Sequence, residues 1–153
     1  MRFKRVIIVF TAIFLIARMG AAEDEIKDLL VLENKYIKIF INSGPEETGR
    51  FAVDVAAGDP LRADDDGKPL IYGHPKPWTS YTTIRINGEN FVFGRATKRR
   101  AGSGVQGGEL IFGPTLINNQ LLTQCQYGQV MADQVLDIAR SPSTGALDTA
   151  RII

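Results

Sequence analysis

The sequence of 153 residues contains one cysteine, Cys125, and one histidine, His74. A single cysteine excludes an internal disulfide, and the two residues together cannot build a Cys/His zinc site. Catalysis by a serine or cysteine nucleophile needs a nearby base, and His74 lies between Gly73 and Pro75 in a predicted loop. The Gly-x-Ser-x-Gly pattern of a nucleophile elbow is missing as well. We therefore predict that Cys125 is a buried, apolar core residue.

The sequence also lacks a strong excess of either charge. Its 18 Lys and Arg residues and 17 acidic residues give a formal net charge of +1. Four of these cations precede Glu23, so the rest of the chain has 14 cations against 17 acids, a formal charge of −3. This balance does not favour general attraction to nucleic acid, and we predict no nucleic-acid partner.

Only one apolar run is long, and it lies at the N-terminus. Residues 6–17 carry no charge and follow a basic stretch, but a membrane-spanning helix needs about 20 residues. Small residues up to Ala22 and the acidic residues after it are typical of a secretory signal. We predict a signal peptide at residues 1–22, with an uncleaved anchor or buried helix as the alternative. The product, one domain at residues 23–153 without a membrane span, is secreted, periplasmic or attached to the cell envelope.

Alternation with a period of two dominates the mature chain and indicates β-strands. It predicts strands at residues 36–41 and 50–55, near enough to pair as a hairpin. Asn87 and Gly88 join two further predicted strands at residues 81–86 and 89–93, because both residues tolerate the positive φ that a type I′ turn requires.

Other segments are less clear. Residues 23–32 fit a short helix or a lead-in, and residues 109–117 contain two short strand candidates broken by Gly113 and Pro114. Residues 121–140 fit either two strands or a helix, and we favour strands. The fold class predicted is all-β, an antiparallel β-sandwich. Because the last apolar run stops without a closing turn, we also expect the sandwich to be incomplete at its C-terminus, as in a truncated or split longer protein.

Two groups of residues are candidate binding sites. Aromatic and imidazole side chains interleaved with prolines resemble a sugar-binding surface, although we favour a role in plugging one end of the core for Trp78 and Tyr81. This group comprises Tyr72, His74, Trp78 and Tyr81. Clustered carboxylates are candidate Ca²⁺ ligands, although we favour a solvated loop for them and their spacing is not that of an EF-hand. This second group comprises Asp59, Asp64, Asp65 and Asp66.

Residues 32–39 (LENKYIKI) and 48–51 (TGRF) resemble the first hairpin of supersandwich domains of the galactose-mutarotase and glycosidase type. Residues 59–94 are also similar to uncharacterised exported bacterial proteins. The resemblance implies a carbohydrate-related β-sandwich, and domains of that type are longer than residues 23–153. The catalytic His and Glu of a mutarotase do not map onto any motif of this chain.

Two functions follow as expectations. The first is an exported, non-catalytic module that binds a glycan or another envelope protein, with no cofactor apart from the candidate Ca²⁺. The alternative is the N-terminal fragment of a carbohydrate-active enzyme that lacks its catalytic part, and a degenerate product without independent function is a third outcome. Glycosidase chemistry needs two carboxylates about 5–9 Å apart, and nothing in the sequence pairs the acids Glu89, Glu109, Asp133 and Asp137.

Overall fold

The computed structural model describes residues 28–45, 48–58, 61, 63–71, 77, 80, 82–95 and 104–153. Over these residues it contains ten β-strands, one short 3₁₀ turn and no α-helix, so the predicted all-β class is confirmed. No helix in this part of the chain has the length and apolar content needed to cross a membrane. The predicted signal peptide lies outside the described residues. The elements are β1 (Leu29–Glu33), β2 (Ile37–Asn42), β3 (Phe51–Val55), η1 (Ala63–Asp65), β4 (Pro69–Ile71), β5 (Thr83–Ile86), β6 (Glu89–Val92), β7 (Glu109–Ile117), β8 (Gln120–Tyr127), β9 (Val130–Ala139) and β10 (Thr149–Ile152).

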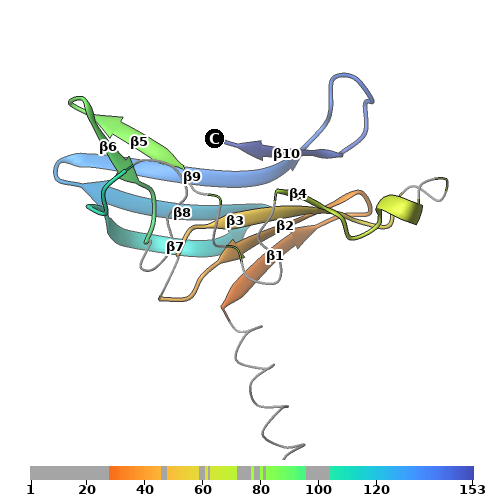
Figure 1. Ribbon diagram of the computed structural model, residues 1–153, viewed down its shortest axis with the longest axis horizontal. Helices are drawn as coiled ribbons and strands as arrows, with labels where there is room; N and C mark the ends of the chain where they lie inside the picture. Colours follow the sequence, from red (N-terminus) through yellow and green to blue (C-terminus); the bar gives the residue numbers. More distant parts are fainter. Residues whose placement is uncertain are drawn as a thin grey trace, which may run out of the picture.

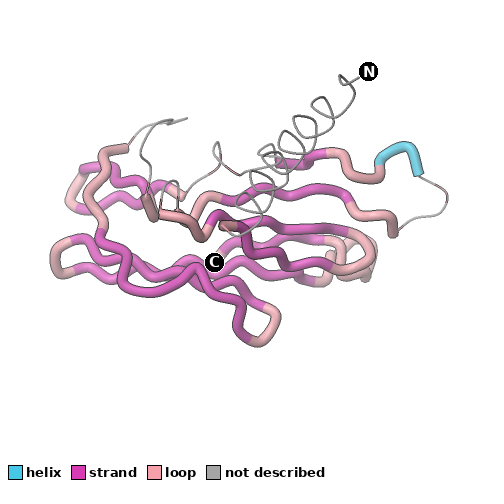
Figure 2. Tube along the Cα trace, turned by 90° about the horizontal axis from the view of Figure 1, so that it is seen from below, coloured by secondary structure: helices cyan, strands magenta, loops and turns pink. Residues whose placement is uncertain are grey.

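The strands form two four-stranded antiparallel sheets and a separate hairpin of β5 and β6 (Figure 1). The first sheet has the order β1-β2-β3-β4, and the second has the order β10-β9-β8-β7. β1 contacts β7, β8 and β9 of the second sheet, and β2 contacts β10. The two sheets therefore lie in facing layers (Figure 2), and the architecture is sandwich-like, as predicted.

The core between the layers follows from the alternation of apolar and polar residues along the strands. In the first sheet, Leu32, Ile39 and Val53 are cross-strand neighbours on one face. In the second sheet, Leu121 lies opposite Leu136. These side chains belong to one buried cluster, and none of them is more than 8% exposed. Removing this apolar surface from water is the main force that holds the sheets together.

A second, smaller cluster lies where the β5–β6 hairpin meets the second sheet. Phe93, Cys125 and Tyr127 form it, and half-buried residues of the hairpin pack against them. The Tyr127 hydroxyl donates a 2.9 Å hydrogen bond to the backbone oxygen of Val92. Cys125 is fully buried, so its predicted place in the core is confirmed.

The predicted turn at Asn87 and Gly88 is also confirmed. The two residues have φ values of 51° and 88°, and the flanking residues Ile86 and Glu89 pair with each other. Positive φ at both central positions is what a type I′ turn requires.

Two predictions of local structure are wrong. The helix considered for residues 23–32 is not formed in the described part, because Leu30 and Leu32 of β1 pair with β2 and turn toward the core. The break expected at Gly113 and Pro114 is not a break, because β7 continues through this cis peptide bond with shifts in its register against β8. The segment at residues 121–140 forms the two strands we favoured, most of β8 and all of β9.

Candidate functional site

The aromatic residues predicted as a ligand platform fall outside the described residues. This holds for Tyr72, His74, Trp78 and Tyr81, so their role stays a prediction. Ser80, which lies among them, accepts a 3.3 Å hydrogen bond at its carbonyl from the first backbone N–H of β3. Ser80 is therefore attached to the start of β3 in the first sheet.

Three of the four predicted Ca²⁺ ligands are described, and Asp59 is not. Asp64 and Asp65 lie in η1 and Asp66 follows it; Asp65 is half-buried and the other two are exposed. Among the described residues, no three His, Cys, Asp or Glu side chains converge in a way that would hold a metal ion. Calcium binding at this loop stays a prediction.

The turn between β1 and β2 is held by a network of hydrogen bonds. Asn34 occupies it, and its side-chain oxygen accepts hydrogen bonds from the backbone N–H groups of Tyr36 (2.8 Å) and Ile37 (3.0 Å). Its side-chain nitrogen donates a 2.6 Å hydrogen bond to the carbonyl of Leu147, in the loop that precedes β10. Asparagine suits this position because its short amide can bond the backbone of its own turn. One side chain thus fixes the turn and joins it to a distant loop.

A first cleft of about 490 Å³ opens between this turn and the loop before β10. Lys35 and Tyr36 contribute from the turn, and the Lys35 ammonium lies 4.6 Å from the centre of the Tyr36 ring. Arg140 directly follows β9 and donates a hydrogen bond to the carbonyl of Gly145, farther along the same loop. The full lining is Asn34, Lys35, Tyr36, Arg140, Thr144, Gly145, Ala146 and Leu147.

The loop that forms one wall of the first cleft is fixed by its own hydrogen bonds. The backbone N–H of Ser141 donates to Ala146 (2.8 Å), and the N–H of Gly145 donates back to Ser141 (2.9 Å). Thr144 donates from its hydroxyl to Asp148 at 2.6 Å. Both walls of the cleft are therefore organised before any ligand arrives.

A second cleft of about 510 Å³ lies on the outer face of the first sheet. Lys38 crosses from β2 to Glu33 of β1 in an ion pair of 2.7 Å, and it is the cross-strand neighbour of Asp54. The ring of Phe40 and the carboxylate of Asp66 also line this cleft. Asp66 is thus the one candidate metal ligand that the structure places at a cleft among the described residues.

The two clefts adjoin, because Asn34 and Lys35 line both. Sequence reasoning missed the residues of the first cleft as a group. Asn34 and Leu147 are 113 positions apart in the chain, and no local pattern links a strand turn to a loop at that distance. The one local signal for this site is Asn34 itself, a residue type that favours turns and that lies just before the predicted strand at residues 36–41.

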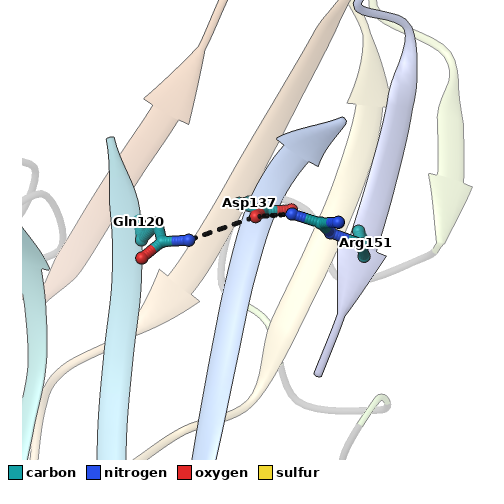
Figure 3. Close-up of polar contacts among 3 residues, drawn as sticks. All are labelled: Gln120, Asp137 and Arg151. Carbon is teal, nitrogen blue, oxygen red and sulfur yellow. Dashed lines mark hydrogen bonds and ion pairs between the residues drawn. The ribbon is translucent and has the colours of Figure 1, made fainter. Parts of the chain in front are cut away.

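Two of the four acids considered for catalysis, Asp133 and Asp137, are engaged in structural bonds on the second sheet. Arg151 donates two hydrogen bonds to Asp137, of 2.9 and 2.6 Å, and Gln120 donates a third of 3.2 Å (Figure 3). The hydrogen bond from Arg151, followed by that from Gln120 and the positive charge of Arg151, lowers the pKa of the Asp137 carboxyl against the opposing effect of burial. Asp133 accepts a 2.7 Å hydrogen bond from Gln124. A carboxyl with a lowered pKa is poorly suited to act as a general acid.

The buried thiol and phenol of the second cluster are both shifted away from ionisation. Burial raises the pKa of the Cys125 thiol, although polar interactions with Gly94 and Tyr127 oppose the shift. Burial is also the largest cause of the raised pKa of Tyr127. A thiol that is buried and resists ionisation is a poor nucleophile, so Cys125 fits a structural role.

No protein-family model matches this chain, and neither a curated protein nor a solved structure is similar enough to count as a match. The resemblance of residues 32–39 and 48–51 to mutarotase-type supersandwich domains therefore stays a prediction. The two clefts are the features of the described residues that bear on function.

Proposed function

We propose that this chain is an exported, non-catalytic β-sandwich module that binds a glycan at the two adjoining clefts beside the β1–β2 turn. The observation that carries the proposal is the composition of these clefts. Each combines an aromatic side chain, Tyr36 or Phe40, with amide and charged groups that form hydrogen bonds. Sugars offer C–H faces to aromatic rings and hydroxyl groups to polar side chains, so this mixture suits them.

The geometry also favours a chain of sugars over a single one. The clefts share Asn34 and Lys35 and are open to solvent, so a ligand can continue from one to the other around the turn. The hydrogen bonds of Asn34 fix the turn between them. A preorganised surface loses less conformational entropy on binding than a mobile one.

Titration of the purified protein with neutral and acidic oligosaccharides, followed by calorimetry, tests the proposal. Tyr36→Ala should weaken binding about ten-fold, because it removes the ring of the first cleft. Phe112→Ala is the matched control, since Phe112 is an aromatic residue of β7 that is 44% exposed and lines neither cleft. Absence of binding to every oligosaccharide, or equal loss in the two variants, would contradict the proposal.

Export is the other half of the proposal and is tested separately. The basic start, the short apolar run and the small residues before Glu23 support removal of residues 1–22. N-terminal sequencing of the protein recovered from outside the cytoplasm should begin at Glu23. Recovery of the chain with Met1 retained would argue against a cleaved signal.

An envelope protein is the second candidate partner, and the apolar side chains of β7 favour it. Leu110, Ile111, Phe112, Leu116 and Ile117 are between 40% and 46% exposed on this edge strand. Large exposed apolar groups often mark protein contacts. A photo-crosslinking side chain in place of Phe112 should then capture one envelope protein in living cells, whereas the same group in place of Tyr36 should not.

A further inference from the structure

The first cleft carries positive charge although the mature chain as a whole is acidic. Lys35 and Arg140 line it, and no carboxylate does. Without residues 1–22 the chain has a formal charge of −3. The charge of this cleft therefore has the opposite sign to the net charge of the chain. Both side chains are exposed and face solvent-accessible space.

The two cations are not neutralised by ion pairs. Lys35 contacts the ring of Tyr36, and Arg140 uses one guanidinium nitrogen for the carbonyl of Gly145. Neither contact supplies negative charge, and a guanidinium has five N–H donors in all. Among the described residues, no carboxylate lies within ion-pair distance of either cation.

Two acids flank the residues of the first cleft in the sequence, and each is bonded to another side chain. Glu33 precedes the turn but pairs with Lys38 at 2.7 Å, in the second cleft. Asp148 follows the loop and accepts a 2.6 Å hydrogen bond from the hydroxyl of Thr144, a residue of the first cleft. Among the described residues, neither acid forms an ion pair with Lys35 or Arg140. The positive charge of Lys35 and Arg140 is therefore open to a ligand.

We propose that the glycan bound at the first cleft is acidic, with its carboxylate or sulfate group held between Lys35 and Arg140. The inference rests on the proposed function and narrows its ligand. A guanidinium binds a planar carboxylate through two parallel hydrogen bonds, and an ammonium adds a point charge. Tyr36 and Asn34 then contact the sugar ring that carries the acid.

The test compares tetragalacturonate with its fully methyl-esterified form, which has the same sugars without the charge. The protein should bind the acid about ten-fold more tightly at low salt, and the difference should shrink as ionic strength rises. Lys35→Gln and Arg140→Gln should each remove most of this difference while binding to the ester is kept. Lys68→Gln is the control, because Lys68 is exposed and lines neither cleft.

Each outcome separates the two proposals. Equal affinity for the acid and the ester, or an equal effect of Lys68→Gln, would overturn the acidic specificity and leave glycan binding intact. Inorganic sulfate that binds as tightly as the oligosaccharide would overturn it as well, because the site would then be a simple anion site. Binding of neither oligosaccharide would count against glycan recognition itself. Circular dichroism melts of the variants confirm that each is folded.

Discussion

Thr123 and Gln134 are polar residues that face each other on the buried side of β8 and β9. They are 1% and 2% exposed and form a cross-strand pair. The Gln134 amide nitrogen donates a 2.7 Å hydrogen bond to the hydroxyl of Thr82. The Thr123 hydroxyl and the Gln134 side-chain oxygen have no hydrogen-bond partner in the described part of the chain. Burial of these two polar atoms without hydrogen bonds therefore destabilises the folded state at this pair.

Replacing Thr123 with valine should stabilise the protein, because valine has nearly the same shape and no polar atom to desolvate. We expect the free energy of unfolding to rise by about 1 kcal/mol. Urea denaturation followed by circular dichroism measures the change. Thr82→Val is the opposing control: it removes the acceptor of Gln134 and should destabilise by about 1 kcal/mol. A Thr123→Val protein less stable than the original would show that the hydroxyl is bonded after all.

The environment of Asp137 leads us to expect that the free energy of unfolding depends on pH in the acid range. Its pKa is lowered in the folded state, first by the hydrogen bond from Arg151. A lowered folded-state pKa means that the ionised carboxyl adds stability above the ordinary aspartate value of about 3.9. This contribution is lost as the pH falls through the lower, folded-state pKa.

Asp137→Asn should therefore flatten the loss of stability between neutral and strongly acid pH. Urea midpoints measured at a series of pH values from neutral to acid give the slope for both proteins. Arg151→Gln should flatten the same slope, since it removes the cation and leaves the carboxyl. An unchanged slope in both variants would mean that the ion pair in Figure 3 does not contribute to folding.

At the scale of elements, close backbone contacts hold the β5–β6 hairpin to the first sheet. Gly94, which follows β6, has a φ of 73°, and a Cβ atom there would lie 2.1 Å from the carbonyl oxygen of Thr48. That carbonyl accepts a 2.9 Å hydrogen bond from the N–H of Arg95. No side chain fits between the two segments, so glycine is required.

Gly94→Ala should destabilise the protein by more than the strain of positive φ alone, which is about 1–2 kcal/mol for alanine. Gly88→Ala is the matched control, because Gly88 also has a positive φ, 88°, and no atom lies within 4 Å of the added Cβ. Thermal melts of the two variants isolate the steric contribution. Equal melting temperatures would show that the hairpin can shift away from Thr48 at no cost.

Elements defined by local chemistry could be predicted from the sequence. The Asn87–Gly88 turn follows from the need for positive φ, and β2 follows from the alternation of Ile37, Ile39 and Ile41. β1 was not predicted as a strand, because its apolar residues also fit a helical period. Only its pairing with β2 decides between a helix and a strand. The order of strands in the sheets, which depends on contacts across the chain, could not be derived.

The first cleft could not be predicted either, because it also depends on contacts between residues that are far apart in the chain. Lys35 and Arg140 line one cleft because the β1–β2 turn lies beside the loop before β10, where Asn34 bonds to Leu147. Each residue taken alone is an ordinary surface group in a turn or at a strand end. The predicted aromatic group was recognisable because its members are neighbours in sequence.

At the scale of the whole molecule, β8 and β9 connect the two core clusters. Leu121 of β8 belongs to the first cluster, and Cys125 and Tyr127 belong to the second. On β9, Leu136 packs in the first cluster, and Ala132 packs against the second. Because two continuous strands run through both, we infer that neither cluster opens without disturbing the other.

Cys125 provides a probe of this coupling, since its thiol is fully buried and becomes reactive only when the second cluster opens. Leu136→Ala creates a cavity in the first cluster and should lower the free energy of unfolding by about 2–5 kcal/mol. If both clusters open together, the rate of thiol labelling should rise by the factor that this loss of stability implies. Labelling with a thiol-reactive chromophore in the native state, compared with urea denaturation, measures both quantities. A labelling rate that Leu136→Ala leaves unchanged would mean that the hairpin opens by itself over Cys125, and that the two sheets are not one cooperative unit.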